Sequence, residues 1–252
     1  MELLRDLLAV DPSRPRLTFY DEPHGVRLEF SATTLANWAN KTAGWLINDC
    51  DFDEVYEQSY PSNQDEPNGR IALASGNNWQ SIGLALGALT VGSHFDVDIT
   101  DRADIILCDL ARAQDYFDQS LDPITGEEAE DAPNIAIVTD DPFGRGVKEI
   151  GEELPDFAID FGPEVRINDD TYHYPCPSIE DALSTLTGRH IEQAPHHKRL
   201  LSHGWSSTED FIENILVPIA QGHTVVVVHG PVSGERLRRI ATEERITDPA
   251  FV

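Results

Sequence analysis

The sequence predicts an α/β fold in which mostly parallel sheets are flanked by helices. Short apolar segments alternate with longer segments of helical periodicity along most of the 252 residues, a pattern typical of α/β folds. Several apolar segments do not alternate with polar residues, above all TVVVVHG at 224–230, so both faces of those strands should be buried. The segments at 16–21 and 26–30 are separated by a short turn and predict a hairpin.

The N-terminal half predicts three helices and several short strands. The predicted elements are a helix at 2–10, the hairpin, a helix at 31–49, a strand at 70–75, a helix at 78–92, and strands at 94–99 and 103–109. A leucine stripe supports the first helix. Ser31 or Thr33 can cap the second helix through its hydroxyl. The helix at 78–92 is apolar almost all round, which predicts burial on several sides, and Gly92 can close it.

The C-terminal half continues the alternation. The predicted elements are a strand at 135–141, an apolar unit at 157–167, a helix at 177–188, a strand at 199–204, a helix at 206–222, the valine strand and a helix at 233–247. Ser178 with Asp181 forms a variant of the capping box, and Ser206 with Glu209 forms another capping box. Pro218 should bend its helix because it removes a backbone donor.

The chain predicts one unit over 1–252 with two approximate sub-blocks, 1–118 and 134–252. An acidic loop at 119–133 joins the sub-blocks, and a second acidic loop rich in turn formers lies at 51–69. We find no tandem repeat in the sequence.

Charge and composition exclude several classes of function. Acidic residues outnumber basic ones by 45 to 18, a formal charge of −27, which disfavours binding to nucleic acid or an anionic membrane. The N-terminus carries acids and lacks the long apolar core of a signal peptide, and no stretch approaches 18 apolar residues. Three cysteines far apart favour a reducing compartment. We expect a cytoplasmic protein that binds neither nucleic acid nor membrane.

Two polar turns look like phosphate loops but lack the necessary residues. The turn Ser75-Gly76-Asn77-Asn78 has one glycine and no nearby lysine, whereas a phosphate cradle gathers several backbone N–H groups. The loop around Gly144-Arg145-Gly146 carries Lys148, but four acidic residues lie close by. We interpret the first as a strand-to-helix turn and the second as a surface loop.

No motif for metal binding or nucleophilic catalysis is present. Six histidines follow residue 189, without HExxH or a helical HxxxH pair: His190, His196, His197, His203, His223 and His229. His203 and His229 fall at predicted strand ends, where α/β proteins build their sites, although a packed or surface role accounts for each. GxSxG is absent, and Cys108 lies in an apolar strand and should be inert. The sequence predicts no catalytic residue, no cofactor and no metal.

Three blocks resemble the start of the adenylate-forming superfamily, the acyl-CoA synthetases and AMP-dependent ligases. The first is EFSATTLANWANKTAGWL, and the second is GRIALASGNNWQSIGLALGALTVGSHFDVD. The third is RLLSHGWSSTEDFIENILVPIAQGHTVVVV, in which Pro218, Gly222 and the valine run fall in place. The order of blocks over 17–247 is similar to the N-terminal subdomains of that family, as in short actinobacterial relatives.

The resemblance also shows what is missing. The family's nucleotide loop, [ST]-S-G-T-T-G-x-P-K-G, should lie between the second and third blocks, but no such cluster is present. The family's later adenine, ribose and catalytic-lysine motifs are absent as well. The resemblance therefore implies a truncated ligase-like protein, inactive alone, that acts as a non-catalytic module for a small molecule or a protein. The alternative is a divergent ligase completed by a partner chain.

By the same resemblance, His203, Gly204 and Trp205 would border a residual substrate pocket, because the family's matching segment lies near its carboxylate substrate. A carboxylic acid is the ligand that this implies. The missing C-terminal domain also leads us to expect a homodimer or a partner protein.

Overall fold

The computed structural model describes residues 2–50, 52, 68–97, 103–121, 125–127, 129 and 132–247. The chain folds into two compact units. Unit 1 joins the two ends of the chain, Met1–Asn37 and Pro177–Val252, and unit 2 is the continuous segment Trp38–Cys176. This division differs from sub-blocks at 1–118 and 134–252. Most of the acidic segment 51–69, and six residues of 119–133, lie outside the described residues.

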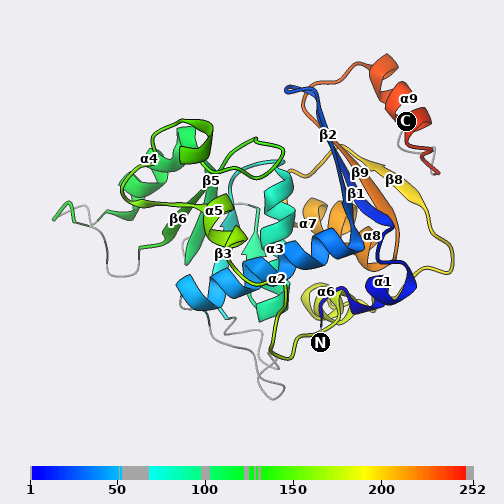
Figure 1. Cartoon of the computed structure of the whole chain (residues 1–252), viewed down its shortest axis with the longest axis horizontal. Coiled ribbons are helices and arrows are strands. Elements are labelled where there is room, and N and C mark those ends of the chain that lie inside the picture. Colours follow the sequence, from blue (N-terminus) through cyan, green and yellow to red (C-terminus); the bar gives the residue numbers. More distant parts are fainter. Residues whose placement is uncertain are drawn as a thin grey trace. The chain divides into compact units, whose positions relative to one another are not determined.

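Unit 1 is built on a four-stranded sheet in the order β2-β1-β9-β8, and Figure 1 shows these strands side by side. Its elements are α1 (Arg5–Val10), β1 (Pro15–Asp21), β2 (Val26–Ser31), α6 (Ile179–Thr187), β8 (Arg199–Ser202), α7 (Thr208–Phe211), a π-helical segment (Ile212–Leu216), α8 (Val217–Ala220), β9 (Thr224–His229) and α9 (Gly234–Glu243). β1 and β2 form the predicted antiparallel hairpin, whereas β1–β9 and β9–β8 are parallel pairs.

Both faces of β9 are buried, as its unbroken valine run predicts. Tyr20, Leu201, Val226 and Val228 form one apolar cluster with Ile240 of α9. Val225 and Val227 have alternate positions on β9 and are fully buried as well. The hydrophobic effect on both faces therefore holds the central strands in place.

The helix predicted at 206–222 is present, with two differences in detail. Ser207, not Ser206, is the N-cap, and its side chain accepts from the Asp210 backbone N–H. Ser206 instead contacts the Asp210 carboxylate through its N–H and its hydroxyl. A π-helical segment lies directly before α8, which contains Pro218, and a proline lacks the N–H that a regular α-helical ladder needs.

Unit 2 contains a five-stranded parallel sheet in the order β4-β3-β5-β6-β7. α2 (Ala32–Asp49) begins in unit 1 and continues in unit 2. The remaining elements are β3 (Arg70–Leu73), α3 (Trp79–Val91), β4 (His94–Asp96), β5 (Ile105–Asp109), α4 (Leu110–Ser120), β6 (Asn134–Val138), a 3-10 turn (Lys148–Ile150), β7 (Ala158–Asp160) and α5 (Phe161–Arg166). This order has its topological switch point between β3 and β5.

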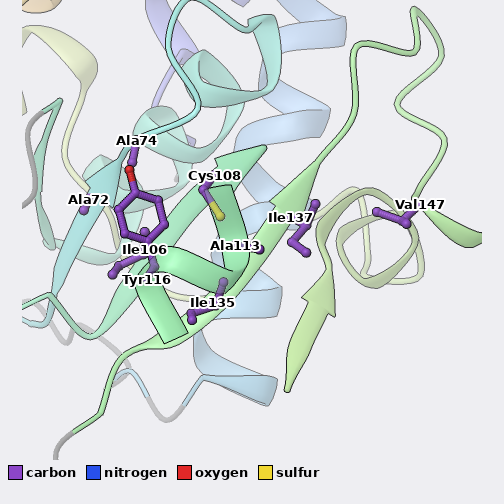
Figure 2. Packing of buried hydrophobic residues seen from close by; sticks show 9 residues of the cluster. All are labelled: Ala72, Ala74, Ile106, Cys108, Ala113, Tyr116, Ile135, Ile137 and Val147. Carbon is purple, nitrogen blue, oxygen red and sulfur yellow. The ribbon is translucent and has the colours of Figure 1, made fainter. Parts of the chain in front are cut away.

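Alternate residues of the unit 2 strands are buried on opposite faces of the sheet. One set forms an apolar cluster with Ala113 and Tyr116 of α4, shown in Figure 2. The alternating set includes Ile71, Leu73 and Leu107, each 1% exposed or less. Burial on both faces is the reason that these strands read as continuous apolar runs.

α3 is buried at every position, as its apolar surface predicts. The Asn78 side chain caps it by accepting from the Gln80 N–H, and Gly92 ends it in the left-handed conformation at φ 71°. In contrast, α4 has no counterpart among the predicted elements. Asp109 caps α4 by accepting from the Arg112 N–H at 3.1 Å.

Candidate functional site

The predicted site residues lie where the parallel strands of unit 1 reach their carboxyl ends. Asp21 ends β1 and is the register partner of His229, which ends β9. Ser202 ends β8 and pairs with Val227, so His203, Gly204 and Trp205 leave the sheet at the same edge. We call this the carboxyl edge of unit 1.

The three predicted residues lie in very different surroundings. The Ser202 hydroxyl accepts from the Gly204 N–H at 3.1 Å, and Gly204 has φ +86°, a conformation that favours glycine. Trp205 is 6% exposed, and its ring packs against Phe211 with centroids 4.6 Å apart. His203 is exposed. The turn thus places the imidazole in solvent and the indole in the core.

A carboxylate–imidazole pair lies at the same edge and was not predicted from the sequence. Asp21 Oδ2 lies 2.7 Å from His24 Nδ1. Asp21 is 8% exposed, and its Oδ1 has no hydrogen-bond partner among the described residues. An ionised Asp21 would accept from Nδ1–H and so fix the tautomer and orientation of the ring. The polar residues that follow the β1 strand in YDEPHG are the sequence signal for this pair.

The exits of β1 and β9 pack closely against each other. The His229 carbonyl accepts from the Glu22 N–H at 3.1 Å, and the His229 ring stacks on Phe19 with centroids 6.4 Å apart. Gly230 has φ +91°, and a Cβ there would lie 2.3 Å from Pro23 Cδ. These contacts hold Asp21 and His229 at the edge on neighbouring strands.

The chemistry available at this edge is proton exchange and hydrogen bonding to a small polar ligand. An imidazole ends or follows each of the three parallel strands: His229 ends β9, and His24 and His203 follow β1 and β8. In the part of the chain that the structure describes, no three His, Cys, Asp or Glu side chains are grouped to hold a metal ion. Burial raises the pKa of the Cys108 thiol in unit 2 to about 12, which keeps it protonated at neutral pH.

The polar turns of unit 2 use their donors internally. Besides capping α3, Asn78 donates through its side-chain amide to Thr139 O at 3.2 Å, and the Ser75 and Ser81 hydroxyls lie 2.7 Å apart. This arrangement agrees with a strand-to-helix turn.

The loop around Gly144-Arg145-Gly146 turns its amides towards carboxylates of the same chain. The Gly146 N–H donates to Glu149 at 2.8 Å, and the Val147 N–H donates to Asp160 at 2.8 Å. A Cβ on Gly146 would lie 2.2 Å from Asp160 Oδ1. Because the chain's own carboxylates accept from these amides, an external anion would have to displace them.

Solved structures share the fold over nearly the whole chain. An acyl-CoA synthetase from Brucella canis matches 98% of this chain and 46% of its own, with a TM-score of 0.64 and 13% identity. The N-terminal domain of FACL13 from Mycobacterium tuberculosis matches 97% of this chain and 60% of its own, with a TM-score of 0.57 and 14% identity. The chain thus spans about half the length of that synthetase, and its fold is that of the N-terminal part of acyl-CoA synthetases and AMP-dependent ligases.

No family model matches the chain. Among the described residues, no helix combines the length and apolarity that crossing a bilayer requires. A Mycobacterium tuberculosis protein described as a TIGR03089 family protein is 30% identical over 254 aligned residues, which cover 96% of this chain and 94% of that protein. The chain therefore belongs to the TIGR03089 family.

Proposed function

We propose that this chain is a non-catalytic binding module with an acyl-CoA synthetase-like fold, and that its ligand is a small carboxylic acid. The small number of lysines and their positions are the main support for the non-catalytic function. Transfer at the α-phosphate of ATP needs cations and N–H donors around the developing charge. The sequence contains three lysines, Lys41, Lys148 and Lys198, and all of them fall within the described residues.

Two of these lysines lie away from strand carboxyl ends. Lys41 Nζ donates to the carbonyls of Arg166 at 3.2 Å and Asn168 at 2.5 Å, and it lies 3.1 Å from an oxygen of Asp170. Lys198 precedes β8, so it lies at the amino end of that strand. Lys148 begins the 3-10 turn, beside Glu149.

The carboxyl edge of unit 1 is itself rich in carboxylates. Glu22 follows Asp21 directly, and Arg236 makes three hydrogen bonds to the two Glu22 oxygens at 2.8–3.2 Å. Arg236 is thus engaged by a carboxylate of the same chain. A triphosphate would meet anionic side chains there, which opposes its binding.

A carboxylic acid makes a smaller demand on the same edge. It carries one negative charge, and a ring N–H of His203, His24 or His229 can donate to it without a cluster of cations. By resemblance to the ligase family, the turn after β8 lies near the acid substrate. The buried ring of Trp205 would offer an apolar wall to an aromatic or acyl group.

Thermal unfolding with a panel of carboxylic acids tests this proposal. We expect an acid to raise the melting temperature without nucleotide, and the His203→Ala variant to lose that shift. His190→Ala is the matched control, since its side chain is 81% exposed and it carries the same substitution. Pyrophosphate release from ATP, Mg²⁺ and any acid by the purified chain would disprove the non-catalytic function. If a protein partner stabilises the chain and no acid does, the ligand is a protein and not a carboxylic acid.

A ligase completed by a second chain is the other candidate, and the match to only 46% of the Brucella canis chain favours it. Adenylate formation in an extract of the source cells would then fall when this protein is removed by antibody. Purified chain alone would not restore activity, whereas the co-precipitated complex would. The expected homodimer is a separate prediction, and sedimentation that shows only monomer at high concentration would contradict it.

A further inference from the structure

The amino ends of the three parallel strands of unit 1 gather positive charge in a strongly acidic protein. β1 begins at Pro15, β8 at Arg199 and β9 at Thr224, and the parallel pairing brings these ends to one edge of the sheet. Arg199, which begins β8, is paired with the Glu244 carboxylate. Five other basic side chains lie in or next to these starts, and we call them the basic cluster: Arg14, Arg16, His197, Lys198 and His223.

Hydrogen bonds between the segments hold the basic cluster together. The Thr224 hydroxyl lies 2.5 Å from the Pro15 carbonyl, which can only accept, so the hydroxyl donates there. Thr224 Oγ1 must then accept from His197 Nε2, 2.9 Å away. The Lys198 N–H donates to His223 Nδ1 at 3.2 Å, so the proton of a neutral His223 ring lies on Nε2.

The cluster has a buried base and an accessible rim. Arg16 is 1% exposed, and its Nη1 donates to the Gly222 carbonyl. Arg16 Nε is buried and has no hydrogen-bond partner in the described part of the chain. His223 is 6% exposed, whereas His197 and Lys198 are exposed and Arg14 is half-buried. An ion approaching from solvent would therefore meet the rim first.

The cations of the cluster repel one another. Partial burial of the His197 ring, together with the charges of Arg14 and Arg16, lowers the pKa of His197, and His223 and Arg199 act in the same direction. Burial, Lys198 and Arg16 lower the pKa of His223. Asp11 acts against this repulsion through its ion pair with Arg14 at 3.3 Å.

We propose that the basic cluster binds a tetrahedral dianion, either free phosphate or the phosphate group of a small molecule. Arg14, His197 and Lys198 would contact the anion from the rim, and the buried Arg16 guanidinium would supply positive charge beneath them, whereas the neutral His223 ring holds the Lys198 backbone N–H. An anion here relieves the mutual repulsion of the Arg14, Arg16 and Lys198 cations, whereas the −27 net charge of the chain repels anions elsewhere. This site lies at the opposite end of the strands from His203–Trp205 and does not depend on the proposed function.

Binding should take up protons. The pKa of His197 is lowered in the free protein, and a bound dianion favours the charged form of that ring. The His223 ring stays neutral because its Nδ1 accepts from the Lys198 N–H. Sulfate is the appropriate probe, because its own charge is constant between pH 6 and pH 8. We expect sulfate to bind about tenfold more tightly at pH 6 than at pH 8, measured by calorimetry at a fixed ionic strength set with chloride.

Two variants that each remove one positive charge test whether the anion binds at the basic cluster. Lys198→Gln removes a rim cation, and we expect it to weaken sulfate binding about tenfold. Lys148→Gln removes an exposed lysine from unit 2 and should leave binding unchanged. Both lysines are exposed, so folding should survive either change. Equal affinity in both variants, or no binding by the wild-type chain, would overturn the proposal.

Histidine resonances give a second readout that does not depend on affinity. Addition of sulfate at pH 7 should move the ring signals of His197 towards the protonated form and leave those of His173, which is exposed in unit 2, unmoved. A parallel titration with inorganic phosphate and with glycerol phosphate distinguishes a free anion from a phosphate ester. Shifts confined to histidines outside the basic cluster would refute the assignment.

Discussion

Two glycines one turn apart in α3 should respond to alanine with opposite signs. A Cβ on Gly83 would lie 3.7 Å from Trp38 Cβ, an ordinary contact. A Cβ on Gly87 would lie 2.6 Å from both Cβ and Cγ2 of Thr42, and 3.2 Å from the Ala43 backbone nitrogen. The close approach of α2 and α3 at Gly87 leaves no room for a methyl group.

The magnitudes follow from helix propensity and packing. Alanine is favoured over glycine by about 0.8–1.0 kcal/mol inside a helix, so Gly83→Ala should stabilise the protein by about 1 kcal/mol. The same gain applies to Gly87→Ala, but overpacking costs about 1–3 kcal/mol. A backbone atom among the neighbours argues for the upper part of that range. We expect a net loss of about 1–2 kcal/mol, which separates the two variants by about 2–3 kcal/mol.

Urea unfolding followed by far-UV circular dichroism measures this difference, and thermal melting provides a second measure. At about 2–4 °C per kcal/mol for a chain of this size, the melting temperatures of the two variants should differ by about 4–12 °C. If both variants are stabilised, or if Gly87→Ala is the more stable one, the inference that α2 and α3 pack too closely at Gly87 to admit a methyl group is refuted.

Three further predictions concern charge. Glu244 is 7% exposed and accepts from Tyr20 Oη at 2.6 Å, from Arg27 Nε at 2.8 Å and from Arg199. Glu244→Gln should therefore lower the free energy of unfolding in urea by about 3 kcal/mol, whereas Glu243→Gln, at an exposed position, should lower it by at most about 0.5 kcal/mol. Equal losses in the two variants would contradict this buried network. Burial and Glu244 raise the pKa of Tyr20 to about 12 from 10.0. The contribution of the neutral Tyr20 hydroxyl to folding stability is therefore complete below pH 10 and is lost as the pH rises through about 12. Alkaline unfolding should therefore be shallower in Tyr20→Phe, and unchanged slopes would reject this linkage. Raising the NaCl concentration from 0.05 to 0.5 M should raise the melting temperature by several degrees, because salt screens the repulsion within a chain of net charge −27. A lower melting temperature at the higher salt concentration would show that specific ion pairs dominate the electrostatic contribution.

Local patterns predicted the elements whose burial is uniform. The valine run of β9 and the apolar surface of α3 are buried as their composition indicates, and Ser178 caps α6 with Asp181 as the capping box predicts. α4 was missed because it is mostly polar, although Leu110, Ala113 and Phe117 have helical spacing and pack in the core. A charged helix with a narrow apolar stripe is easily taken for a loop.

The candidate site was predicted only in part, for a different physical reason. His203 and His229 could be placed at strand ends from the sequence, because strand ends follow from local apolar runs. The contact between Asp21 and His24 depends on the conformation of the β1–β2 turn, which the hydrophobic pattern does not specify. The basic cluster depends on β1 lying beside β9, a pairing between opposite ends of the chain.

That pairing also sets an order for folding during synthesis. β1 must wait for about 200 further residues before β9 exists to pair with it, and an isolated hairpin such as β1–β2 is marginally stable in water. Unit 2 is continuous along the chain and can form on the ribosome while the N-terminal hairpin is still without its sheet. The last part of unit 1 to be made, the segment from β9 onwards, therefore determines when the newly made protein buries its first strand, and until then that strand is exposed to chaperones and proteases.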